Sequence, residues 1–130
     1  MEDSAFSDAF CRFLQATVPS VEAAELLLLL AKQPETRWEA RQAVEALKKS
    51  VTISEAEAAR FFELFQARSV VTGGPDKRFQ YRAATRELEE HVAMLARAYN
   101  ERPVTLIRVI YGLRDAKIQS FADAFRLKKG

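Results

Sequence analysis

Residues 54–82 read SEAEAARFFELFQARSVVTGGPDKRFQYR, and this stretch decides the fold. Ser54 is followed three residues later by Glu57, a capping box that marks the first turn of a helix. We expect this helix to run to about Arg68. Two short runs with β-strand composition come after it, at residues 69–72 and 78–82. Between them, the sequence GGPDK has the composition of a tight turn, so the stretch predicts a helix that leads directly into a β-hairpin.

Three helices are predicted before this stretch. A stripe of phenylalanines at helical spacing predicts a first helix over Asp3–Thr17. Ser20 is expected to cap a second helix, whose five consecutive leucines, residues 26–30, point in all directions and should be buried on several sides. Thr36 is the candidate N-cap of a third helix that runs to Lys49 and is joined to Ser54 by a short connector.

The chain after the hairpin is predicted to be helical again. Thr85 is the candidate N-cap of a helix with a long apolar stripe, and Pro103 suits the first position of the next helix. Residues 104–111 are almost wholly apolar, and their β-branched content keeps a strand open as the alternative. We expect Gly112 to end this segment and Ser120 to begin a last short helix with Phe121 and Phe125. The apolar stripe of the helix that begins after Thr85 consists of Leu88, Val92, Leu95, Ala96 and Tyr99.

The composition indicates one globular domain. Of the 130 residues, 48% are hydrophobic and 29% are charged, which argues against disorder. The formal net charge is only +2, so nucleic-acid binding has to be argued from where basic residues cluster. A single cysteine, Cys11, excludes an intramolecular disulfide and fits a reducing compartment. The acidic N-terminus is unlike a secretory signal, and the longest apolar run is far shorter than a membrane span, so we expect a cytoplasmic protein with no membrane partner.

The order of helix, short turn, capped helix and hairpin resembles the winged helix-turn-helix superfamily of bacterial transcriptional regulators over Ser20–Arg82. The tail, RPVTLIRVIY at residues 102–111 and FADAFRLKK at residues 121–129, resembles that of a group of uncharacterised bacterial winged-helix proteins. The resemblance implies a mainly α fold in a single domain, residues 1–130. It would consist of an N-terminal helix (1–18), a winged-helix core with a two-stranded wing (20–82) and a helical extension (85–130).

In the superfamily pattern the helix after Ser54 is the recognition helix. The resemblance implies that Ala58, Phe62 and Phe65 are buried, together with Ile53, Val70 and Val71. The positions that the resemblance places toward the DNA groove are Glu55, Ala56, Glu57, Ala59 and Arg60. Phe61 and Leu64 are two further positions that could face the groove, and this point stays open. This outward face departs from a good DNA reader, because three acids, Glu55, Glu57 and Glu63, oppose Arg60 and Arg68. Acids near the helix start repel phosphates unless they accept hydrogen bonds from cytosine amino groups.

Basic residues of the hairpin and of the preceding helix are the better candidates for DNA contacts. Arg78 and Arg82 share one strand face, so Phe79 and Tyr81 should point into the core. The same cations could instead keep a sheet edge soluble, and both interpretations stay open. On the preceding helix, basic residues predict a second positive patch, which is also common on solvated helices. The candidates are Lys77, Arg78 and Arg82 on the hairpin and Arg37, Arg41, Lys48 and Lys49 before it.

Catalytic and metal sites are not indicated. His91 and Glu87 share a helix face, but two ligands do not make a zinc site, and a solvated histidine is the expected alternative. We expect Cys11 to be a buried, inert thiol. The sequence GGPDK lacks the spacing of a phosphate loop, and no nucleophile has a matched base. We therefore expect neither an enzyme nor a cofactor.

Two functions follow as hypotheses. The first is a regulator that binds double-stranded DNA, with Arg60 as the candidate base contact and Glu55 beside it on the groove-facing side of the helix. Lys77, Arg78 and Arg82 of the hairpin would contact phosphates or the minor groove, and Arg41, Lys48 and Lys49 would add phosphate contacts. The second is a winged-helix module that binds a protein through Phe61 and Leu64 and does not bind DNA. Surplus apolar surface on the terminal helices predicts a homodimer, and a monomer wrapped by its own helices is the alternative.

Overall fold

The computed structural model describes residues 6–115. This part of the chain is mainly helical, with one small antiparallel sheet of two strands, so the predicted mainly α class with a hairpin is confirmed. A further helical segment covers residues 103–115. The elements are α1 (Asp8–Thr17), α2 (Val21–Lys32), α3 (Ala40–Leu47), α4 (Glu55–Ala67), β1 (Val71–Gly73), β2 (Phe79–Tyr81) and α5 (Arg86–Glu101).

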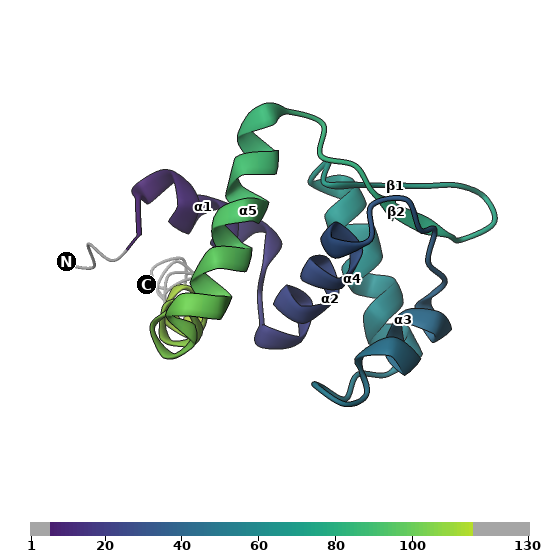
Figure 1. Cartoon of the computed structure of the whole chain (residues 1–130), viewed down its shortest axis with the longest axis horizontal. Coiled ribbons are helices and arrows are strands. Elements are labelled where there is room, and N and C mark those ends of the chain that lie inside the picture. The colour runs from purple at the N-terminus through teal and green to yellow at the C-terminus, as the bar shows by residue number, and fades with distance from the viewer. Residues whose placement is uncertain (1–5, 116–130) are drawn as a thin grey trace, which may run out of the picture.

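Helix α2 lies at the centre of the fold and packs against α3, α4, α5 and β2 (Figure 1). Ser20 caps it as predicted, because its hydroxyl accepts a hydrogen bond from the backbone N–H of Ala23 at 3.2 Å. Three of the five leucines, Leu26, Leu27 and Leu30, are fully buried, and the other two are half-buried. This burial on several sides explains why so short a helix carries an apolar run.

Helix α4 is built as its sequence predicts. Both hydrogen bonds of the capping box form: Glu57 N–H donates to the Ser54 hydroxyl at 3.0 Å, and Ser54 N–H donates to the Glu57 carboxylate at 2.9 Å. The helix ends at Ala67, one residue from the predicted end. The six predicted core positions are all buried: Ile53, Ala58, Phe62, Phe65, Val70 and Val71.

The hairpin is fastened to α4 and to the segment before α3. Strands β1 and β2 pair in antiparallel register, with Gly73 opposite Phe79. The Phe79 ring stacks on Phe62 of α4, with ring centroids 4.9 Å apart. On its other edge β2 forms an isolated bridge with Trp38, through Trp38 N–H to Phe79 O at 2.7 Å and Phe79 N–H to Trp38 O at 2.8 Å. An extended residue therefore completes the sheet where the sequence predicted helix.

The predicted start of the third helix was wrong. Helix α3 begins at Ala40 rather than at Thr36 and ends at Leu47 rather than at Lys49. Its N-cap is Glu39, whose backbone N–H donates to the Gln42 side chain at 2.9 Å. The bridge between Trp38 and Phe79 holds this segment extended, and it buries Trp38 at 8% exposure, so a tertiary contact overrides the local helix signal.

The other corrections concern the terminal helices. Helix α1 begins at Asp8, not Asp3, because Ser7 caps it by accepting from Phe10 N–H at 3.1 Å. Gly112 does not end the segment that starts at Pro103, and the strand alternative was wrong, since residues 103–115 are helical. On α5, Ala98 rather than Ala96 belongs to the buried stripe. The predicted helix from Ser120 lies outside the described residues.

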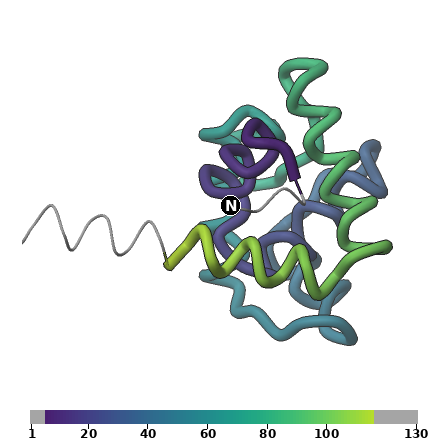
Figure 2. Tube along the Cα trace, turned by 90° about the vertical axis from the view of Figure 1, so that its left-hand side faces the viewer, coloured from purple at the N-terminus to yellow at the C-terminus, as the bar shows by residue number. Residues whose placement is uncertain are grey.

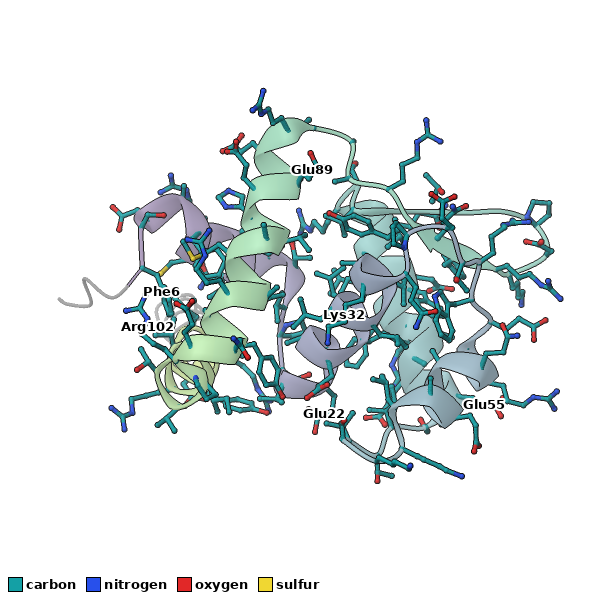
Figure 3. All side chains as sticks on the ribbon, viewed as in Figure 1. Phe6, Glu22, Lys32, Glu55, Glu89 and Arg102 are labelled. Carbon is teal, nitrogen blue, oxygen red and sulfur yellow. The ribbon has the colours of Figure 1, made fainter. Side chains whose placement is uncertain are left out.

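The helical segment 103–115 lies against α1 and the start of α2 (Figure 2). Leu106 and Ile110 are buried, and Tyr111 accepts a hydrogen bond from Val21 N–H at 3.4 Å. The Arg102 guanidinium stands 5.0 Å above the Phe6 ring centroid (Figure 3). Within residues 6–115, no single helix is long and apolar enough to cross a membrane, although α1 and α2, bent by 98° at their junction, reach the required length and apolarity jointly.

Replacement of Ser54 by Ala tests the capping box. The change removes the acceptor for Glu57 N–H and should lower the free energy of unfolding by about 1 kcal/mol. Urea denaturation monitored by circular dichroism measures this difference. Ser50→Ala is the matched control, because Ser50 is exposed and its hydroxyl has no partner within residues 6–115. Equal losses in the two variants would contradict the role of the cap.

Candidate functional site

The outward face of α4 is acidic at its start. Glu55, Arg60 and Glu63 are exposed, and Glu57 is half-buried because it closes the capping box. Acids in the first turn stabilise the positive end of the helix dipole. The side chain of Glu55 lies on the side of the molecule farthest from Phe6 and Arg102 (Figure 3). The predicted base contact Arg60 and the predicted groove-facing Glu55 are therefore accessible, but positive charge does not dominate this face.

The apolar residues predicted on this face are only partly available. Phe61 and Leu64 are both half-buried. Phe61 packs against the core, and its ring stacks on Phe65 with centroids 6.5 Å apart. The face of α4 thus offers only part of the Phe61 side chain rather than a free aromatic ring.

The tip of the hairpin, residues 74–78, is a tight turn that exposes Lys77. The Asp76 carboxylate accepts from Arg78 N–H at 3.1 Å, and Lys77 N–H donates to Gly74 O at 3.0 Å. Lys77 adopts φ of 60°, in the left-handed region that favours glycine. Its ammonium has no ion pair within residues 6–115 and is free to meet an anion.

Two ion pairs join the hairpin tip to the segment before α3. Arg37 binds Asp76 in a bidentate arrangement, with N–O distances of 3.2 and 3.3 Å. Arg78 binds Glu39 at 3.3 Å. All four side chains are 40–50% exposed, so each pair is worth roughly 0–1 kcal/mol. Both pairs nevertheless place an arginine that was predicted to contact phosphate, Arg37 or Arg78, beside a carboxylate. The positions of the charges in the sequence do not reveal this pairing.

Arg78 and Arg82 do not act together. Arg82 is exposed at the base of the hairpin, where it lines a groove of about 560 Å³ with Gln66 and Ser69. A separation of four residues corresponds to about 13 Å along a strand, which divides the two charges between the tip and the base of the hairpin. Gln80 lies between them, and its amide donates to Pro34 O at 2.8 Å. The predicted orientation of Phe79 and Tyr81 is confirmed in part, because both pack against the core and stay half-buried.

The predicted basic patch on α3 is also divided. Arg41 is exposed in the first turn and forms no ion pair within the described range 6–115. Lys48 binds Glu45, and the hydrogen bond to this carboxylate raises the pKa of the lysine. Lys49 is exposed beyond the helix end and has no ion pair in the same range.

The predicted environment of His91 was wrong. Its side chain is 17% exposed, and its ring stacks on Phe13 with centroids 5.2 Å apart, so it is a packing residue between α1 and α5. The predicted neighbour is present, because Nε2 lies 3.7 Å from the Glu87 carboxylate. Cys11 is half-buried, and burial raises the pKa of its thiol. Within residues 6–115 no three His, Cys, Asp or Glu side chains are grouped as metal ligands would be.

A groove of about 620 Å³ lies away from the hairpin between α2, α3 and α5. Leu28 and Leu29 line it beside Tyr99, whose hydroxyl donates to Glu25. Burial, followed by the hydrogen bond to Glu25, raises the pKa of Tyr99 to about 12. This groove contains none of the predicted site residues.

Comparison of the chain with protein-family models, with curated proteins and with solved structures found no match.

Gly73→Ala tests the contact that positions the hairpin. A Cβ at this position would lie 2.4 Å from Cε2 of Phe79, so the ring would have to leave Phe62. We expect a loss of about 1–3 kcal/mol in the free energy of unfolding, as for other overpacked sites. Gly112→Ala is the control with the opposite sign, because its new Cβ would meet no atom within 4 Å and alanine favours a helix by about 0.5–1 kcal/mol. Thermal denaturation compares the two, and a stable Gly73→Ala variant would contradict the packing.

Proposed function

We propose that this protein is a cytoplasmic DNA-binding transcriptional regulator of the winged helix-turn-helix type. The helix-turn-helix would be α3 and α4, and the hairpin would be the wing. Arg41, Arg60 and Lys77 would contact duplex DNA from three consecutive elements, α3, α4 and the hairpin tip.

The single observation that carries this proposal is the free ammonium of Lys77 on a turn braced by Asp76. A non-glycine residue in the left-handed region costs free energy, and such residues gather at functional sites. Gly73 and Phe79 are the strand pair that closes this turn, and the Phe79 ring packs on Phe62 of α4. A lysine at the end of so rigid a support can reach a phosphate with little loss of conformational entropy beyond that of its own side chain.

Electrostatics place most of the affinity outside α4. Phosphate neutralisation dominates binding to DNA, and the acids Glu55, Glu57 and Glu63 oppose it on α4. Arg78 would have to exchange Glu39 for a phosphate, so its net contribution is smaller than that of Lys77. In this proposal the protein therefore binds DNA mainly through the hairpin and α3.

Salt dependence of binding to a labelled duplex, followed by fluorescence anisotropy, tests this proposal. Lys77→Ala should weaken binding and reduce the slope of log K against log salt by about 0.9, the value for one lost phosphate contact. Glu39→Gln should strengthen binding, because it frees Arg78 and keeps the shape of the side chain.

Arg97→Ala is the matched control, an exposed arginine on α5 outside the proposed face. The proposal is overturned if the wild-type protein shows no salt-dependent binding, or if Arg97→Ala and Lys77→Ala have equal effects.

A second candidate function is a protein-binding module that uses the same face. The observation that favours it is the excess of acids on α4 next to the half-buried side chain of Phe61. Such a surface fits a basic segment of a partner that also carries apolar side chains.

Charge reversal separates the two functions. Glu55→Lys combined with Glu63→Lys should raise the affinity for DNA several-fold if α4 faces a duplex, since each change removes a repulsion and adds a cation. If α4 binds a protein, the same variant should lose that partner in quantitative co-purification from cells. Glu101→Lys combined with Asp115→Lys, which changes two exposed acids outside α4 and adds the same charge of +4, controls for net charge. Partner recovery that is equal in both variants would eliminate the second function.

A further inference from the structure

A second positive site lies at the opposite end of α4 from Glu55. A groove of about 290 Å³ is formed where α1, the end of α4 and the start of α5 meet. Arg12 of α1 and Arg68, the C-cap of α4, both line it. The aromatic floor comes from Phe13, on which the ring of His91 stacks.

Both arginines line this groove, together with one acid, Glu87. Both are exposed, and neither forms an ion pair within residues 6–115. Asp8 lies one turn before Arg12 but does not bind it, and the acid of the groove, Glu87, lies against His91. The arginines at the hairpin tip differ in this respect, because Arg37 and Arg78 each form an ion pair with a carboxylate. The groove thus carries two cations and one acid, and a bound anion would offset the excess positive charge.

We propose that the groove between Arg12 and Arg68 binds a phosphate group. Guanidinium groups present paired N–H donors that match phosphate oxygens, and they keep their charge at every physiological pH. At about 290 Å³ the groove is slightly smaller than most small-molecule sites, which measure about 300–1,000 Å³, so it suits one small anionic group rather than a large apolar ligand.

A second phosphate group could bind in the groove next to the one that Arg12 and Arg68 line. Arg68 is followed by Ser69, which lines the neighbouring groove at the base of the hairpin together with Arg82. Arg82 also lacks an ion pair within the described part of the chain. The phosphate could thus belong to a small phosphorylated ligand or to the backbone of a nucleic acid that runs past the end of α4. This inference stands on the groove alone and does not require the proposed function.

Titration of the full-length protein with inorganic phosphate, observed by NMR, tests the site. Sodium chloride at equal ionic strength is the reference. The side-chain Nε–H signals of Arg12 and Arg68 should shift and saturate with phosphate and not with chloride. Arg12→Ala or Arg68→Ala should raise the dissociation constant at least about tenfold, which corresponds to ~1.4 kcal/mol. Arg97→Ala, an exposed arginine that lines neither groove, should leave it unchanged.

Thermal denaturation of each variant shows whether a loss of binding reflects a loss of the fold. Arg12→Lys, which keeps the charge, should restore part of the affinity for phosphate.

A second experiment uses a short duplex DNA. If Arg12→Ala and Arg68→Ala lower both the DNA affinity and its salt slope, the phosphate belongs to a nucleic-acid backbone. If only inorganic phosphate binding falls, the site serves a small phosphorylated ligand. Shifts that do not saturate, or that chloride reproduces, overturn the inference. Loss of DNA binding in Lys77→Ala with intact phosphate binding would separate this site from the hairpin.

Discussion

Phe79 is the residue on which the arrangement of the hairpin depends. Its backbone exchanges two hydrogen bonds with Trp38, and its ring stacks on Phe62 of α4. Gly73, its partner in the opposite strand, has no side chain and leaves room for that ring. A two-stranded hairpin is marginal in water by itself. These three contacts supply the missing stability and hold the hairpin tip at a fixed position relative to α3 and α4.

Signals confined to a few residues predicted most of the fold. Ser20, Ser54 and Thr85 were identified as N-caps, and each accepts the expected hydrogen bond. The predictions failed where a distant contact decides the outcome. Trp38 is extended because it pairs with Phe79, and a helix pattern at Thr36 carries no information about that partner. Gly112 is tolerated within a helix because Leu106 and Ile110 bury the adjacent turns, which offsets its cost of about 0.5–1 kcal/mol.

The candidate site was predictable as a set of charges but not as a pattern of pairs. The sequence identifies Arg78 and Lys77 as adjacent basic residues, yet one binds Glu39 and the other is free. Pairing is set by the approach of the segment before α3, which depends in turn on the bridge at Trp38. For the same reason, nothing in the sequence distinguishes Arg12 from other exposed basic residues. It becomes significant only when the packing of α1 against α5 brings it to the groove that Arg68 lines.

The dipole of α4 accounts for this distribution of charge. The start of a helix is stabilised by acids and its end by bases, and α4 has Glu55 and Glu57 at the first and Arg68 at the second. Removal of Glu57 to suit DNA would cost the capping box, because its carboxylate accepts the hydrogen bond from Ser54 N–H. The requirement for a stable α4 thus conflicts with the requirement for a positive outward face. An anionic partner is consequently expected to be held beside α4, at the hairpin tip or at the arginines near the end of the helix, rather than along the helix itself.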